Sequence, residues 1–131
     1  MSAPTSIHYG HLRILRYLRG TIDRRIFFSR TSSLQHYAYS DATWGTDPSY
    51  LKSIFAYCVF LGSSLVSWKT KKQTIVAHSS AVAELRALAC VTAEVTWLRC
   101  LIADFGASLT STPMHCGSTG AISIAQDPVN Y

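Results

Sequence analysis

Residues 53–70 read SIFAYCVFLGSSLVSWKT, and this stretch predicts a β-hairpin. Its first half is rich in β-branched and aromatic side chains, which favour a buried strand over residues 53–61. Gly62-Ser63-Ser64 is a turn signal, and residues 65–70 supply the returning strand. Because residues 36–42 form a further strand candidate just before the hairpin, the three strands together predict a β-meander.

A long helix is expected after the meander, over residues 79–105. Ser79 or Ser80 can cap its start, and Gly106 supplies a stop. Apolar residues recur in this segment at steps of three and four, namely at Leu85, Leu88, Val95, Leu98, Ile102 and Phe105. A short strand at 114–116 and a short helix at 119–126 should follow. This order predicts the α/β class, with helices packed on a mixed sheet.

The first 33 residues have a different pattern. Residues 5–19 predict an amphipathic helix that begins near Pro4 and ends at Gly20. One narrow side of it is apolar and the opposite side is basic; the apolar side holds Ile7, His11, Ile14, Leu15 and Leu18, and the basic side holds Arg13, Arg16 and Arg19. Residues 26–28 are long enough for a short strand, and residues 31–33 can serve as a linker. We therefore divide the chain into residues 1–33 and residues 34–131.

Composition limits the class of protein. Hydrophobic residues make up 48% of the 131 residues and charged residues 15%, which excludes intrinsic disorder. No apolar run approaches the roughly 20 residues that span a bilayer. The formal net charge of +5 allows an anionic partner without requiring one. The cysteines show no CxxC spacing, so buried, reduced thiols are expected at Cys58, Cys90, Cys100 and Cys116.

Cellular location is open between two compartments. The chain has no secretory signal, which favours the cytoplasm. However, an Arg-rich, nearly acid-free amphipathic helix near Met1 is typical of a mitochondrial targeting segment. The alternative is that this helix is an inherited structural element.

Several ordered motifs resemble one family. Residues 39–44, YSDATW, resemble the "YSDADW" strand that opens the RNase H domain of copia-type LTR retrotransposon polyproteins. Residues 13–21, RILRYLRGT, resemble that family's "RILRYLKGT" connection between reverse transcriptase and RNase H. Later motifs of the family are matched in order by residues 52–53, 57–62, 67–73, 79–85, 97–99 and 127–129. The resemblance implies an incomplete RNase H-like mixed sheet with a long packed helix, lacking the last strand and the C-terminal helix.

The same resemblance implies a damaged catalytic centre. Family members hold two Mg²⁺ ions between four acidic residues and hydrolyse RNA in RNA–DNA hybrids, a reaction that needs hard oxygen ligands. The first two acids correspond to Asp41 and Glu84, but the third, in a "CDN" triplet, corresponds to Gly117. The fourth belongs to a segment that would follow Tyr131. Asp41 and Glu84 are therefore expected to be vestigial, with Mg²⁺ relevant only to residual nuclease activity.

Other candidate residues each have two interpretations. Lys69, Lys71 and Lys72 can hold a nucleic-acid backbone or form a solvated turn. The tryptophans can stack on bases, but core or interface packing is favoured, at Trp44, Trp68 and Trp97. Structural roles are favoured for His78 and His115.

The sequence thus supports three functional hypotheses. The first is a retrotransposon-derived protein without nuclease activity that acts by protein–protein contact, with a mitochondrial host partner as one option. The second is residual Mg²⁺-dependent ribonuclease H activity through Asp41 and Glu84. The third is non-catalytic binding of RNA or a hybrid duplex. A sheet that lacks its last strand also predicts self-association through the uncovered edge.

Overall fold

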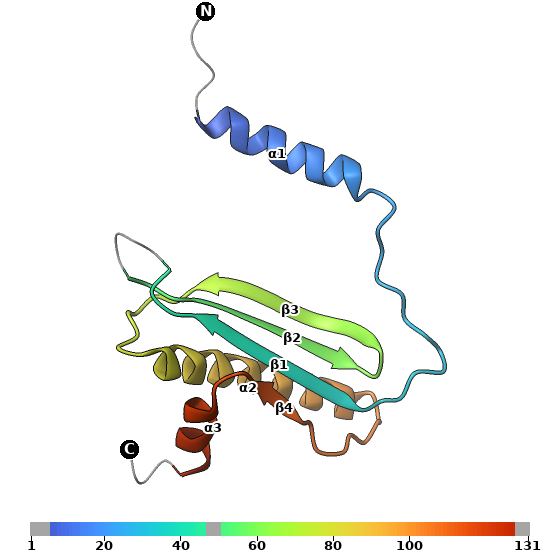
Figure 1. Cartoon of the computed structure of the whole chain (residues 1–131). Helices are drawn as coiled ribbons and strands as arrows, with labels where there is room; N and C mark the ends of the chain where they lie inside the picture. The colour runs from blue at the N-terminus through green and yellow to red at the C-terminus, as the bar shows by residue number, and fades with distance from the viewer. Residues whose placement is uncertain (1–5, 47–50, 128–131) are drawn as a thin grey trace, which may run out of the picture.

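The computed structural model describes residues 6–46 and 51–127, with the backbone alone described for residues 6–9. Its elements are α1 (Ser6–Gly20), β1 (His36–Thr43), β2 (Ile54–Leu61), β3 (Ser64–Lys72), α2 (Ser80–Asp104), β4 (Met114–Cys116) and α3 (Thr119–Gln126) (Figure 1). The predicted helix start at residues 4–5 and most of the motif at 127–129 lie outside the described residues.

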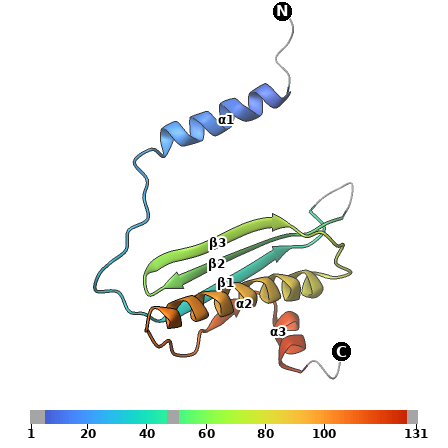
Figure 2. The same ribbon diagram turned by 180° about the vertical axis from the view of Figure 1, so that it is seen from behind.

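The four described strands form one mixed sheet in the order β3-β2-β1-β4. β1 pairs antiparallel with β2, and β2 pairs antiparallel with β3, which is the predicted meander. β4 pairs with β1 in the parallel direction, so the chain must cross over between β3 and β4. α2 makes that crossover along one face of the sheet (Figure 2). The predicted α/β class with a mixed sheet is confirmed.

The hairpin between β2 and β3 depends on one glycine. Gly62 has φ +58°, a left-handed conformation that favours glycine, and its N–H donates to the Gln35 carbonyl at 2.7 Å. A Cβ added to Gly62 would overlap the Ser33 carbonyl oxygen. The two-residue turn Gly62-Ser63 therefore both reverses the chain and receives the segment that leads into β1.

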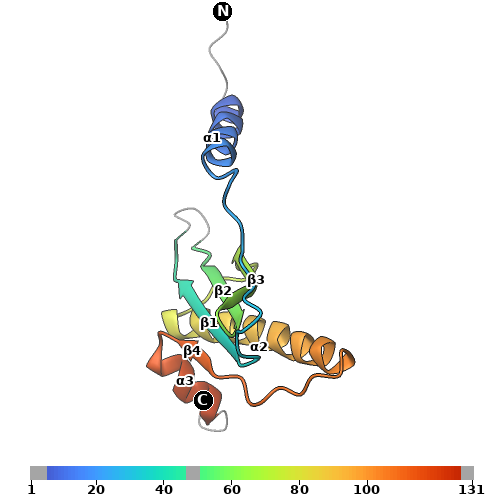
Figure 3. The same ribbon diagram turned by 90° about the vertical axis from the view of Figure 1, so that its right-hand side faces the viewer.

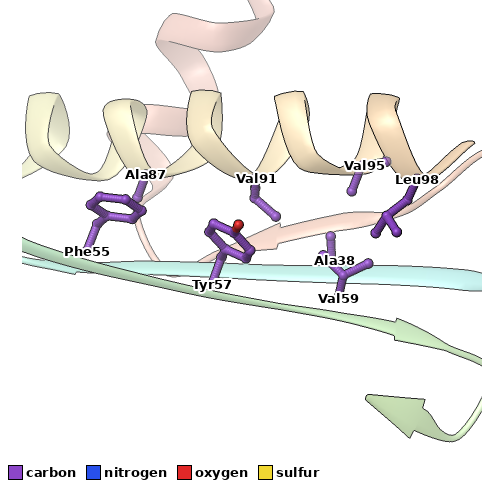
Figure 4. Close-up of a cluster of buried hydrophobic side chains, with 8 residues drawn as sticks. All are labelled: Ala38, Phe55, Tyr57, Val59, Ala87, Val91, Val95 and Leu98. Carbon is purple, nitrogen blue, oxygen red and sulfur yellow. The ribbon is translucent and has the colours of Figure 1, made fainter. Parts of the chain in front are cut away.

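The core lies between the sheet and α2 (Figure 4). Alternate residues of β2 point towards α2, as the period of a strand requires. On α2, the residues that face the sheet recur at steps of three and four. The buried cluster consists of Ala38, Phe55, Tyr57, Val59, Ala87, Val91, Val95 and Leu98. Full burial of one such valine contributes about 1.5–3 kcal/mol, so this cluster is the main source of stability.

The ends of α2 match the sequence signals. The Ser79 hydroxyl accepts a hydrogen bond from the Val82 backbone N–H at 3.2 Å, which makes Ser79 the N-cap. Gly106 has φ +80° and donates its N–H to the Ala103 carbonyl at 2.8 Å. Phe105, which was predicted on the apolar face, is 79% exposed just beyond the helix, so that prediction was wrong. Ala83 and Ala87 face the sheet instead, and their small side chains let the helix and the sheet approach closely.

Two further predictions concern burial: the one for Cys90 and Cys100 was wrong, and for the tryptophans the structure excludes only the core alternative. Cys90 and Cys100 are exposed, because these positions of α2 lie away from the stripe that packs on the sheet. None of the tryptophans is in the core, since Trp44, Trp68 and Trp97 are 53%, 60% and 58% exposed. Trp44 is nevertheless held in place, because its indole N–H donates to the Ala77 carbonyl at 2.8 Å.

α1 forms as expected but lies apart from the sheet, on the side away from α2 (Figure 3). The predicted short strand at residues 26–28 was wrong, because these residues take no strand conformation. No described strand pairs with this segment, although the Phe27 carbonyl accepts a hydrogen bond from the Ser64 hydroxyl at 3.4 Å. Phe27 and Phe28 are consequently left 78% and 64% exposed.

His36, at the start of β1, is a buried polar group that the sequence analysis did not single out. It is 1% exposed, and neither ring nitrogen has a hydrogen-bond partner among the described residues. Burial, and to a smaller extent the positive charge of Arg99, lower the pKa of His36 below its ordinary value of 6.5. The folded protein therefore holds this histidine neutral.

This histidine should make folding sensitive to mild acid. Below pH 6.5 the unfolded chain takes up a proton that folded His36 resists, so stability should be constant above that pH and fall below it. His36→Leu should flatten this dependence and raise the free energy of unfolding at pH 7 by about 1 kcal/mol, since it removes an unsatisfied polar group. Urea denaturation at several pH values measures both effects. The exposed His78→Leu is the control; if it flattens the profile equally, His36 is not the sensor.

Candidate functional site

Asp41 and Glu84 meet where β1 passes the first turns of α2. Asp41 is an exposed residue of β1, whereas Glu84 is 8% exposed on the buried side of α2. Their carboxyl groups interact by a hydrogen bond, and the Ala42 backbone also hydrogen-bonds Glu84. The structure therefore brings together the two acidic residues that the resemblance selected, although 43 positions of sequence (41 to 84) separate them.

Burial is the main influence on the pKa of the Glu84 carboxyl. It raises the pKa of the Glu84 carboxyl above its ordinary value, and the neighbouring Asp41 carboxylate raises it further. Hydrogen bonds from Ala42 and Cys116 act in the opposite direction. The net effect is a raised pKa, so Glu84 releases its proton less readily than an isolated glutamate does.

At the end of β4, the residue that contacts the acidic pair is a cysteine. Cys116 lies opposite Ser40 in the β1–β4 register, and its Sγ donates to Glu84 Oε2 at 3.5 Å. Burial raises the pKa of Cys116, which keeps the thiol protonated. The next residue, Gly117, has no side chain, and the hydroxyl of Ser118 is engaged as the N-cap of α3, accepting from the Ala121 N–H at 3.2 Å.

These residues do not fit a two-magnesium centre. Mg²⁺ requires hard oxygen ligands in near-octahedral geometry, whereas a protonated thiol is neither hard nor anionic. In the described residues, no group of three or more His, Cys, Asp or Glu side chains is placed to hold a metal ion. The chemistry that remains at this site is a hydrogen-bonded carboxyl pair with a thiol beside it.

The lysines predicted to bind nucleic acid lie on β3, which is two strands away from β1 and Asp41 in the sheet. Lys69, Lys71 and Lys72 are exposed and line one cavity together with Arg86 from α2. Sequence reasoning missed Arg86, because its proximity to the lysines depends on how α2 crosses the sheet. The arginines of the predicted basic helix side, Arg13, Arg16 and Arg19, are exposed on α1.

The contacts of two histidines and one arginine point to structural roles. The His115 ring stacks on Tyr39 with centroids 4.8 Å apart, which joins β4 to β1. His78 is exposed beside Trp44, with which it lines a small cavity. Arg99 donates to the carbonyls of Leu109 and Thr110 and to the Thr112 hydroxyl, so it ties the α2–β4 connection to the helix.

Comparison with known proteins finds relatives among transposon sequences. The chain is 39% identical to the "Retrovirus-related Pol polyprotein from transposon RE2" of Arabidopsis thaliana, over 98% of this chain and 9% of that polyprotein. It is also 39% identical to "Uncharacterized mitochondrial protein AtMg00810" of the same plant, over 74% of this chain and 41% of the relative. The chain thus spans about a tenth of the RE2 polyprotein and less than half of the mitochondrial relative.

A third relative comes from another organism. "Secreted RxLR effector protein 161" of Plasmopara viticola is 39% identical over 74% of this chain and 69% of its own length. No family model matches the chain, and no solved structure gives a significant match. Within the described residues, no helix is both long and apolar enough to cross a membrane.

Proposed function

The chain belongs to the same family as segments of the copia-type retrovirus-related Pol polyproteins, and from that premise we propose what it does. It is a retrotransposon-derived, RNase H-like protein that has lost nuclease activity and acts by protein–protein contact. Its partners are a second copy of the chain and a host protein. The observation that carries this proposal is the apolar surface of α1 and the segment after it.

Loss of catalysis is supported by the residues around Glu84. A two-metal nuclease needs several carboxylates to hold the ions that bind the attacking and leaving oxygens. Here Gly117 occupies the position that corresponds to the third acid, and it supplies no carboxylate. The surviving pair of Asp41 and Glu84 resembles a remnant of a metal site more than a working one.

The apolar surface runs along one side of α1 and continues into residues 21–28. Each of its large side chains is more than half exposed, and apolar side chains gathered in one exposed segment are typical of an interaction surface. They are Ile14, Leu15, Leu18, Ile22, Phe27 and Phe28, and we call this set the α1 surface. Exposure of such a surface to water is unfavourable, and the free energy falls when another protein covers it.

A second copy of the chain is the partner that this surface fits directly. The arginines of α1 lie on the opposite side of the helix from its apolar stripe. Two copies can therefore pack stripe against stripe without bringing Arg13, Arg16 and Arg19 of each together. The outer edges of β3 and β4, which pair with no other described strand, offer an additional route to association.

Phe27→Asp should weaken self-association by about tenfold or more, because burying one phenylalanine is worth about 1.5–3 kcal/mol. Light scattering over a concentration series measures the dissociation constant. Phe105→Asp is a matched control, since Phe105 is 79% exposed and Phe27 is 78% exposed. A wild-type chain that stays monomeric at micromolar concentration, or equal weakening by both variants, would remove the α1 surface as the interface.

For location we propose the cytoplasm, with import into mitochondria as the alternative. The mitochondrial option is supported by the basic, amphipathic α1 and by the printed name of one relative. A fluorescent protein fused behind residues 1–33 separates the two. Signal in mitochondria supports import, and a diffuse signal excludes it.

A further inference from the structure

A cavity of about 430 Å³ lies between β3, the loop that follows it and α2. This volume is within the usual range for small-molecule sites, about 300–1,000 Å³. The cavity is separate from the Asp41–Glu84 pair, and none of the six side chains of the α1 surface lines it. It therefore calls for an explanation independent of protein association.

One side of the cavity is strongly basic. Lys69 and Lys71 pair with Tyr57 and Phe55 of β2, so both lysines project from the face of β3 that looks towards α2. Among the described residues, the side chain of neither lysine forms a hydrogen bond or an ion pair. Arg86 adds a third cation, and its Nη1 is fixed by donating to the Ile75 carbonyl at 3.1 Å and the Val76 carbonyl at 3.2 Å.

No acidic residue lines this cavity. Glu94, two turns further along α2 than Ala87, does not reach it, and Glu94 Oε1 instead accepts a hydrogen bond from Ser67 at 2.7 Å. The cations are therefore not neutralised by carboxylates in the cavity wall. An anion with geometry suited to two or three cations, above all a phosphate, is the group that such a wall attracts.

The remaining wall is apolar, and one of its residues carries a buried, unsatisfied acceptor. Phe55, Ile75 and Ala89 supply flat apolar surface. Gln73, which also lines the cavity, is 93% buried; its Nε2 donates to the Ala83 carbonyl at 2.9 Å, but its Oε1 has no partner among the described residues. A buried acceptor without a donor costs about 1–3 kcal/mol. The Gln73 Oε1 atom is itself shielded from the surface, so a ligand N–H recovers this cost only when the Gln73 amide turns towards the cavity.

We propose that this cavity is a binding site for a nucleoside phosphate. The three features together select that class: cations for the phosphate, an apolar wall for a planar base, and the Gln73 amide, once turned towards the cavity, for an amino group on the base. The site uses no residue of the α1 surface and does not depend on self-association.

Isothermal titration of the full chain with adenosine monophosphate in low-salt buffer tests this site. We expect adenosine monophosphate to bind at least about tenfold more tightly than adenosine or inorganic phosphate, because only the nucleotide uses both walls. Purine riboside monophosphate lacks the amino group, and it should bind about threefold to tenfold more weakly, which is the value of one hydrogen bond. If phosphate alone binds as tightly as the nucleotide, the site does not recognise a nucleoside.

Two variants distinguish a defined site from general attraction by positive charge. Lys69→Gln with Lys71→Gln should weaken nucleotide binding by about tenfold or more. Arg16→Gln with Arg19→Gln removes the same charge from α1 and should change it by less than about twofold, since distant charges are screened. Equal weakening by both pairs would show that net charge alone is responsible, and would overturn the proposal.

Ala89→Phe tests the cavity without a change of charge. Ala89 is exposed on α2, so the larger side chain fills the cavity without disturbing the core. Nucleotide binding should be lost while the circular dichroism spectrum and melting temperature stay unchanged. Retained binding would refute the site. A short oligoadenylate that binds when the mononucleotide does not would also refute it, in favour of a nucleic-acid backbone surface.

Discussion

Val91→Asp should unfold the protein. Val91 is fully buried in the middle of α2, between the helix and the sheet. Aspartate there would either keep a charge in the core without a partner or take up a proton to avoid it, and both cost free energy. We expect a loss of about 4 kcal/mol or more, a large part of the roughly 5–15 kcal/mol that typically stabilises a domain.

Ala93→Asp is the matched control for this prediction. Ala93 is exposed two positions further along the same helix, so the same charge stays in water. Its cost should be about 1 kcal/mol or less, mainly from helix propensity. Urea denaturation followed by circular dichroism measures both variants. Similar midpoints for the two would mean that α2 is not packed on the sheet through the Val91 face.

Gly117→Asp should create divalent-cation binding where the wild-type chain has little. A Cβ at Gly117 meets no atom within 4 Å, and the residue needs no left-handed backbone, so the change is sterically free. The new carboxylate would follow Cys116, which already contacts Glu84. A third carboxylate should tighten Mn²⁺ binding by about tenfold or more, because affinity for hard cations rises with the number of charged oxygen ligands.

Gly117→Asn has nearly the same shape without the charge and serves as the control. Titration calorimetry with Mn²⁺ measures both variants, and equal affinities would show that position 117 does not face the Asp41–Glu84 pair. The wild-type chain should not cleave a labelled RNA–DNA hybrid in Mg²⁺ or Mn²⁺. Cleavage that Asp41→Asn abolishes would overturn the proposed loss of catalysis.

Much of the fold could be predicted because local signals agreed with one another. The hairpin required glycine at position 62, and the capping serine and terminal glycine of α2 were visible in the sequence. The failures share a cause. The strand predicted at residues 26–28, the buried cysteines and the core alternative for the tryptophans all took hydrophobicity as a sign of burial. Burial depends on whether another element lies over the side chain, and apolar side chains also remain on surfaces.

The acidic pair was recognisable in the sequence only through a resemblance. Period and composition do not show that Asp41 and Glu84 meet, nor that a thiol at Cys116 donates to Glu84. The partnerless His36 and the unsatisfied oxygen of Gln73 were equally invisible, because hydrogen-bond satisfaction is a property of assembled neighbours.

The amino-acid sequence alone was enough to predict most of the helices and strands, the hairpin turn, the family resemblance and the lack of an acid at position 117. These depend on residue identity and on spacing over a few positions. Which side of α2 is buried became clear only from the assembled fold. The same holds for the cavity that Arg86 and Gln73 share with Lys69 and Lys71, and for the uncovered apolar side of α1. Those facts arise because α2 crosses the sheet along one path, which brings together side chains that are distant in the chain.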